Sequence, residues 1–390
     1  MLRGQYFALN LTILILVAIN LRAPITSIGP IAEIVQKYYQ ISSSEVGLLT
    51  SLPLMAFGIF SFFAMYLQTS LALFLALISM LIGEILRSYG SHFLPNNSAL
   101  FLGTIIIGFG IAIGNVVLPI FVKSKFKKNL SKIMSLYSLI INSSGFLGIL
   151  VALPLVLMLP IPHALATWTI LAFIALIAFL PYTKNKRLFK KRKRIQKSQN
   201  LFFSKTAWSV TIFMGFQCSI AYCLLAWFPT FIVEKGYSLQ YASNITLFMQ
   251  LISLPASFIC PILLTRFKGK KEALYIACLC ILYFLGFISL YYAKEPLEIF
   301  ISTSIIAIPF GGVFGIVLLF ISQKAIQVST ASKLSAMAQG IGYIIGAIGP
   351  YLIGKIHDIT FRYDYGILLL ALYALFLLIV ASLSYRAKPI

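Results

Sequence analysis

Apolar residues occur along this chain in long continuous runs, not in the short alternating runs of sheet proteins. About 20 apolar residues suffice for a helix to cross a bilayer, and these runs are too continuous for the strands of a membrane barrel. The pattern therefore predicts an all-α membrane protein with twelve transmembrane helices. The expected spans are 6–30, 45–66, 70–88, 98–122, 133–158, 164–183, 206–232, 241–265, 273–292, 298–321, 333–354 and 365–385.

The composition supports the same class. The chain has 390 residues, of which 60% are hydrophobic and 10% charged, whereas soluble domains carry about 25% charged residues. The first apolar run is not followed by a small-residue cleavage site, so we expect it to be an uncleaved first helix rather than a signal peptide.

Lysine and arginine are distributed unevenly between alternate loops. With a cytoplasmic N-terminus, 24 of the 31 basic residues fall in cytoplasmic segments, six fall on the opposite side, and Arg22 lies within a span. This asymmetry predicts that both termini are cytoplasmic. It also argues against nucleic-acid binding as the reason for the net charge of +22.

The chain divides near its middle and repeats itself weakly. A basic segment at 184–205 separates two six-helix halves, 1–183 and 206–390, and is expected to be a cytoplasmic linker near anionic lipid. Residues of the fifth expected helix recur in the eleventh at a constant offset of 201. They are Lys132, Gly145 and Gly148, matched by Lys333, Gly346 and Gly349. Parallel halves of this kind are typical of secondary transporters.

Arg22 is the most informative single residue, because it lies inside the first apolar run. A guanidinium stays charged in proteins, and a charge at the bilayer centre costs about 2.5–3.5 kcal/mol on insertion scales. Its planar fork of donors suits a carboxylate or another small planar or linear anion. Counted from residue 6, Arg22 lies about 24 Å along the helix, which is beyond the middle of a core about 30 Å thick. The alternative to an anion site is therefore an arginine whose side chain reaches the outer membrane surface. Pro24 and Gly29 are expected to loosen the helix there.

Motifs in five helices make the chain resemble the cyanate/2-nitroimidazole transporter branch of the major facilitator superfamily. The resemblance runs almost end to end. The motifs are Asn20-Leu-Arg-Ala-Pro-Ile-Thr-Ser-Ile-Gly-Pro30, Gly110-Ile-Ala-Ile-Gly-Asn-Val-Val-Leu-Pro119, Leu224-Leu-Ala-Trp-Phe-Pro229, Gln250-Leu-Ile-Ser-Leu-Pro-Ala-Ser257 and Leu334-Ser-Ala-Met-Ala-Gln-Gly-Ile-Gly-Tyr343.

This resemblance implies the superfamily fold of two pseudo-symmetric six-helix halves. It also implies a carrier of the bacterial inner membrane that moves a small anion or small polar heterocycle by alternating access. Helices 1, 4, 7 and 10 line the cavity in this superfamily. The expected partners are a small-molecule substrate, the lipid bilayer and, as a candidate, protons; no nucleic acid is expected, and the protein is expected to be a monomer.

Polar side chains within the apolar runs are the remaining candidates for substrate contact. Unpaired burial of a polar group costs about 1–3 kcal/mol, so each should pair with another helix or face a cavity, and both interpretations stay open. Gln339 and Tyr343 share a helix face at i and i+4. Trp227 is a cavity residue by the family match, or an interfacial belt residue. The set is Arg22, Asn20, Thr26, Asn115, Tyr222, Trp227, Gln250, Gln339 and Tyr343.

Glu84 is the one acid deep within an expected span, and Arg87 follows one turn later. An acid in this position can carry protons. An arginine at i+3 favours a structural ion pair instead, and the sequence favours this second interpretation.

Metal, cofactor and enzyme chemistry find no support in the sequence. The five cysteines lack CxxC spacing, the three histidines are far apart, and no phosphate-binding glycine motif follows a strand. We therefore expect no cofactor and no enzyme.

The connection at 66–71 is short and uncharged, where the superfamily usually has a charged loop. Two alternatives to a carrier of small anions stay open. One is an efflux carrier for nitroimidazole-like drugs, and the other is a transport-inactive scaffold or receptor.

Overall fold

Helices make up the architecture of this protein. The computed structural model describes the chain except residues 1, 65–68, 91–96, 127–129, 184–200 and 327. Within the described residues, 12 segments are long and apolar enough to cross a membrane, as the sequence predicts. The expected basic linker falls largely on 184–200, and the uncharged connection at 66–71 falls largely on 65–68, both outside the described residues.

The first span differs from the single helix expected over 6–30. It consists of α1 (Leu2–Asn20), the short helix α2 (Ala23–Thr26), a 3-10 turn (Gly29–Ile31) and α3 (Ala32–Tyr39). Pro24 lies in the first turn of α2, where its missing N–H is tolerated. The chain breaks at Leu21 and Arg22, whereas other helices, such as α9 at Pro229, continue through a proline.

The other spans are single helices that extend a few residues beyond most of the expected limits. The eleventh, expected over 333–354, differs most. The helices are α4 (Ser43–Ala64), α5 (Thr69–Tyr89), α6 (Ser98–Lys125), α7 (Leu130–Met158), α8 (Ile161–Thr183), α9 (Lys205–Glu234), α10 (Leu239–Arg266), α11 (Lys270–Tyr292), α12 (Pro296–Gln323), α13 (Val328–Thr360) and α14 (Asp364–Arg386).

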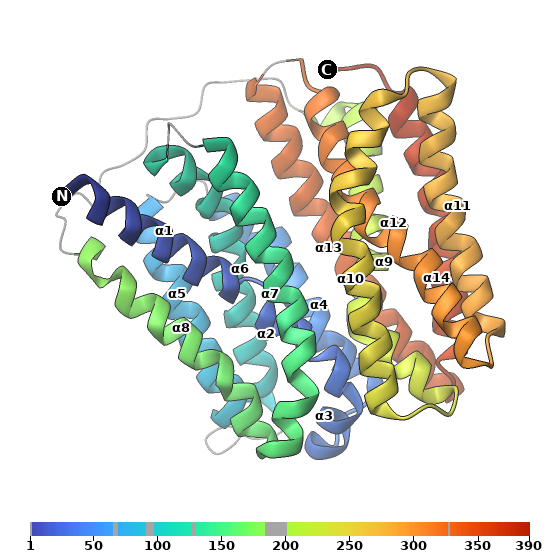
Figure 1. Ribbon diagram of the computed structural model, residues 1–390, viewed down its shortest axis with the longest axis horizontal. Coiled ribbons are helices and arrows are strands. Elements are labelled where there is room, and N and C mark those ends of the chain that lie inside the picture. Colours follow the sequence, from blue (N-terminus) through green and yellow to red (C-terminus); the bar gives the residue numbers. More distant parts are fainter. Residues whose placement is uncertain (1, 65–68, 91–96, 127–129, 184–200, 327) are drawn as a thin grey trace. The chain divides into compact units, whose positions relative to one another are not determined.

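The chain forms two compact units (Figure 1). The first contains residues 1–40 and 52–195, and the second contains 41–51 and 196–390. In the first, α5 packs along both α6 and α8. In the second, α9 packs against α13, α10 against α12, and α11 against α14. The first turns of α4 thus belong with the second unit, whereas the sequence places all of 1–183 in one half.

Glycines permit the closest helix contacts in both units, and they do so at equivalent places. A methyl group on Gly148 of α7 would lie 2.8 Å from the Ala23 carbonyl oxygen, and one on its counterpart Gly349 of α13 would lie 2.7 Å from Cys223 Sγ in α9. Small residues let helix backbones approach in this way. The fifth span therefore packs on the first as the eleventh packs on the seventh, in line with the offset of 201 between these glycines.

Candidate functional site

Arg22 occupies the break between α1 and α2 in the first unit. It is the residue before α2, with φ −130° and ψ −43°, and its side chain is half-buried. The first candidate membrane span runs from Phe7 to Tyr39, so Arg22 lies next to the middle of that span. This segment is longer than the expected span 6–30 because it includes α2, the 3-10 turn and α3.

The two neighbours proposed beside Arg22 are buried at the same break. Asn20 is 1% exposed; its Nδ2 donates to the Leu16 carbonyl at 2.8 Å, while its Oδ1 has no protein hydrogen-bond partner. Thr26 Oγ1 donates to the Arg22 carbonyl at 3.2 Å and lies 3.0 Å from the Gly145 carbonyl of α7. These contacts hold the broken segment against α7 and fix the backbone of Arg22.

Helices α6 and α7 bring further polar groups to this region. Asn115 of α6 is half-buried, and the preceding Gly114 lies so near α1 that a methyl group there would be 2.6 Å from Leu21 Cδ2. Tyr137 of α7 is buried, and its hydroxyl interacts electrostatically with Arg22. The first unit therefore gathers a permanent cation and neutral polar side chains around the helix break.

In the second unit, Tyr222 and Tyr343 lie together. Their rings, from α9 and α13, meet edge to face with centroids 6.5 Å apart, and both residues are buried. Gln339 stands one turn before Tyr343, as predicted, and its Nε2 donates to Ser335 Oγ at 2.7 Å. The arrangement offers aromatic surface and an amide on neighbouring helices, which suits a small planar ligand.

Trp227 has a different environment from Tyr222. It is 1% exposed, its Nε1 donates to the Pro350 carbonyl at 2.9 Å, and its ring lies 5.4 Å from that of Tyr363. It is therefore not an interfacial belt residue. Gln217, ten residues earlier in α9, donates instead to the Tyr283 hydroxyl at 3.3 Å. Gln217, Tyr222 and Trp227 thus contact different partners.

Gln250 lies in α10, where it is half-buried. Its backbone carbonyl accepts a hydrogen bond from Ser253 Oγ at 2.8 Å. The candidate residues thus form two groups, each described within its own unit. The first group is Arg22, Asn20, Thr26 and Asn115, and the second is Tyr222, Trp227, Gln250, Gln339 and Tyr343.

The ion pair favoured for Glu84 and Arg87 is wrong. Neither Glu84 oxygen has a hydrogen-bond partner, and the ion pair found within the described residues is Arg362–Asp364. Arg87 Nη1 instead donates to the Pro24 carbonyl at 2.9 Å. The last carbonyls of a helix have no intrahelical partner, so the end of the short α2 offers an acceptor that the sequence pattern did not reveal.

A second cluster escaped the sequence analysis because its members are more than 300 residues apart. The Asp358 carboxylate accepts from the backbone N–H groups of Ser43 and Ser44 at 2.9 and 3.0 Å. The Ser43 hydroxyl lies 2.9 Å from His357 Nδ1 and 3.0 Å from the Tyr363 hydroxyl. An anion at a helix N-terminus is stabilised by the unpaired N–H groups there. Asp358 therefore caps α4 and attaches its first turn to the second unit.

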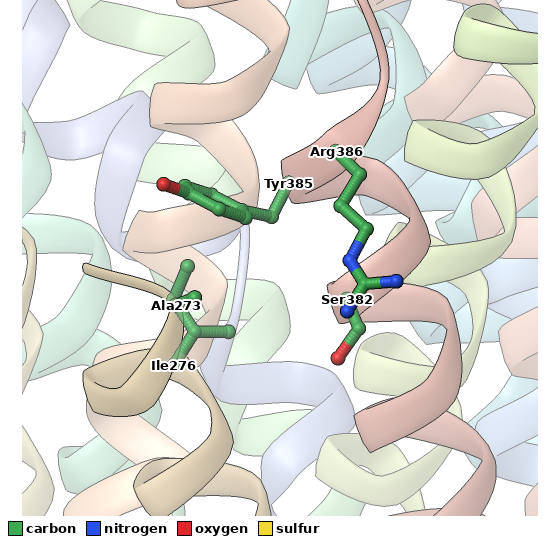
Figure 2. Close-up of a pocket in the computed structure, with 5 residues that line it drawn as sticks. All are labelled: Ala273, Ile276, Ser382, Tyr385 and Arg386. Atoms are coloured by element: carbon green, nitrogen blue, oxygen red, sulfur yellow. The ribbon is translucent and has the colours of Figure 1, made fainter. Parts of the chain in front are cut away.

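A small cavity lies between α11 and α14 (Figure 2). Its volume is about 40 Å³, whereas cavities that hold small ligands measure about 300–1,000 Å³. The Arg386 side chain extends beside Ser382 in Figure 2, and none of the candidate substrate residues lines this cavity. The lining residues are Ala273, Ile276, Ser382, Tyr385 and Arg386. Among the residues that the structure describes, no group of three or more His, Cys, Asp or Glu is placed to hold a metal ion.

Comparison with known proteins agrees with this architecture. The family model described as Major Facilitator Superfamily matches residues 14–347. The chain is 34% identical to the uncharacterized transporter YycB of Bacillus subtilis, with 92% of this chain and 89% of that protein covered. It is 29% identical to the 2-nitroimidazole transporter of Escherichia coli, with 97% and 95% covered.

Two further comparisons bear on the branch and on the fold. The chain is 26% identical to the cyanate transport protein CynX of Escherichia coli, with 90% of this chain and 91% of that protein covered. The crystal structure of a D-xylose-proton symporter superposes with a TM-score of 0.78 at 13% identity, with 98% of both chains covered. The chain therefore belongs to the major facilitator superfamily of multi-pass membrane transporters.

Proposed function

We propose that this protein is a secondary active transporter that moves a small anion or small polar heterocycle across the bacterial inner membrane by alternating access. The observation that carries the proposal is the position of Arg22, at a helix break next to the middle of the first span. Secondary transporters typically form their substrate sites from discontinuous helices.

The chemistry of Arg22 favours an anion. Its charge is permanent, and keeping it inside a span costs free energy that an anionic substrate offsets. Tyr137 and Asn115 add neutral polar groups near the break. A guanidinium holds a small anion through short charge-assisted hydrogen bonds.

The second unit carries its own group of residues proposed to contact the substrate. Tyr222 and Tyr343 present aromatic surface, and Gln339 presents an amide. Gln250 of α10 is the further candidate. Aromatic faces bury much apolar area and favour flat ligands. The proposed substrate is therefore small and planar or linear, of the cyanate or nitroimidazole type that the names of two relatives indicate for those proteins.

The proposed topology follows from the distribution of charge. The excess of lysine and arginine in alternate loops supports cytoplasmic termini, and we propose that the transporter acts as a monomer. The driving energy is a gradient of the substrate or of protons.

Counterflow in proteoliposomes tests the proposal. Liposomes loaded with unlabelled cyanate or unlabelled 2-nitroimidazole should take up the corresponding labelled compound, because a carrier exchanges substrate without net transport. Arg22→Gln should abolish exchange of cyanate, whereas Asn142→Ala, an exposed position of α7, should not. Absence of exchange with both compounds would contradict the proposal and favour a transport-inactive scaffold or receptor.

Efflux of a neutral nitroimidazole-like compound is the second candidate. The pair of rings from Tyr222 and Tyr343 favours it, as does the identity of 29% to the 2-nitroimidazole transporter. A neutral heterocycle depends on aromatic contact more than on a cation. Under this alternative, exchange of 2-nitroimidazole survives Arg22→Gln and is lost in Tyr222→Ala.

A further inference from the structure

Glu84 and Arg87 form a buried polar cluster in α5 that the proposed substrate site does not use. Glu84 is 0% exposed and Arg87 is 3% exposed. Both lie in the first unit, where α6 closes over them: a methyl group on Gly83 would lie 2.7 Å from the Gly103 carbonyl oxygen. A carboxyl group and a guanidinium are thus enclosed within the helix packing.

Several polar atoms of this cluster lack protein hydrogen-bond partners. They include both carboxylate oxygens of Glu84, Nε and Nη2 of Arg87, Ser88 Oγ and the hydroxyl of Tyr39. Buried polar groups are almost always paired, and exceptions mark strained or functional places. Within the part of the chain that the structure describes, the Arg87 guanidinium donates to the Pro24 carbonyl and not to Glu84.

Charge balance makes Glu84 the group that changes state. A buried charge without a bonded partner costs several kcal/mol, and arginine does not shed its proton in proteins. Glu84 can avoid the cost by binding a proton, since a protonated carboxyl group is neutral. It can lose that proton when the Arg87 guanidinium turns from Pro24 to the carboxylate, because the two charges then pair.

Few other titratable groups face this pair. Arg87 and Glu84 interact electrostatically with one another, and Arg87 also interacts with Tyr39 of α3. On α8, His163 contacts the ring of Tyr89, with centroids 5.6 Å apart, at the end of α5. The titratable residues of α6 are lysines in its last turn. Arg87 is therefore the charge that controls the protonation of Glu84.

We propose that Glu84 is the proton-binding group of this transporter and that Arg87 links its protonation to the helix break at Arg22. The carboxylate takes a proton from water on one side and becomes a neutral acid. It returns that proton to water on the other side, so one proton crosses per cycle. This inference deepens the proposed function and rests on it for the coupling to substrate.

The link to the substrate site is the hydrogen bond from Arg87 to Pro24. Pro24 is the second residue of α2, and Arg22 is the residue that precedes this helix. A guanidinium that leaves the Pro24 carbonyl for Glu84 removes a contact that holds α2. A change of position at Arg22 on substrate binding and a change of protonation at Glu84 are thus coupled through the hydrogen bond from Arg87 to Pro24.

Infrared spectroscopy tests proton binding without any substrate. In hydrated protein–lipid films, a protonated buried carboxyl group gives a carbonyl stretching band distinct from that of a carboxylate. The wild type should show this band, its intensity should change with pH, and Glu84→Gln should remove it. Glu33→Gln, a half-buried acid of α3, should leave it in place. A spectrum unchanged by Glu84→Gln would overturn the proposal.

Proteoliposomes with an imposed pH gradient test the coupling. One pH unit supports up to about tenfold accumulation per coupled proton, since each unit corresponds to about 1.36 kcal/mol. The wild type should accumulate labelled cyanate or labelled 2-nitroimidazole against its gradient. Glu84→Gln should lose this accumulation but keep counterflow, and Glu84→Asp should restore it in part. Full accumulation by Glu84→Gln would refute the coupling.

The two experiments separate the two proposals. Absence of counterflow by the wild type with both compounds would contradict the proposed function. The infrared band would still decide whether Glu84 binds a proton. Retained counterflow in Glu84→Gln shows that the variant is folded, so its loss of accumulation is then attributable to the missing carboxyl group.

Discussion

The attachment of α4 to the second unit depends on Asp358, and its removal should be costly. Both carboxylate oxygens accept backbone N–H groups of the first turn of α4, at 2.9 and 3.0 Å. Asp358→Ala leaves these donors without their acceptor. The Glu45 carboxylate, in the first turn of α4, already accepts the N–H of Ser42 at 2.8 Å. It therefore does not replace Asp358 as the acceptor for Ser43 and Ser44.

The magnitude follows from the number and type of hydrogen bonds. A hydrogen bond to a charged group contributes about 1.5–3 kcal/mol, so the loss of two such bonds, partly exposed to water, should cost about 2–4 kcal/mol. For a unit of roughly 200 residues, each kcal/mol shifts the midpoint of thermal unfolding by about 2–4 °C. Asp358→Ala should therefore lower the midpoint by roughly 5–10 °C. Asp358→Asn keeps one acceptor oxygen and should have an intermediate effect.

Thermal unfolding of the detergent-solubilised protein measures this shift. Asp364→Ala is the matched control, because its ion pair with Arg362 is exposed at the surface and such pairs contribute at most about 1 kcal/mol. Equal midpoints for Asp358→Ala and Asp364→Ala would show that the cap on α4 does not stabilise the fold.

Two further substitutions test the packing that positions the candidate site. Gly148→Ala should destabilise the protein by about 1–3 kcal/mol, because the new methyl group would meet the Ala23 carbonyl at 2.8 Å. Gly145→Ala should be tolerated, since the nearest atom there is 3.7 Å away; equal unfolding midpoints for the pair would contradict this. Trp227→Phe removes the 2.9 Å bond to the Pro350 carbonyl and should cost about 1–3 kcal/mol. An unchanged midpoint for Trp227→Phe would show that this bond does not contribute.

The sequence predicts the helices well because the membrane leaves few options. Long apolar runs must become helices, since unpaired backbone groups are too costly in lipid. The first span is the exception. Pro24 and Gly29 signalled a weak helix, but hydropathy alone did not reveal that the chain breaks at Arg22 and continues to Tyr39.

The candidate site was predictable only in part. Helical spacing placed Gln339 and Tyr343 on one face. The structure shows that the ring of Tyr222, also a candidate from the sequence, lies against that of Tyr343. The acceptor of Arg87 was not predictable, because Pro24 becomes available only once α2 ends early. The cap from Asp358 to Ser43 spans 315 residues, and no local pattern in one sequence indicates a contact between such distant segments.

Binding of cyanate to the purified protein tests the role of Arg22 most directly. Isothermal titration should compare wild type, Arg22→Lys and Arg22→Gln. A hydrogen bond to a charged group contributes about 1.5–3 kcal/mol, so its loss weakens binding about 10- to 150-fold. We predict this loss for Arg22→Gln and a smaller one for Arg22→Lys, which keeps the charge but not the planar fork. Equal affinity of wild type and Arg22→Gln for cyanate would contradict the assignment of Arg22 as the anion-binding group.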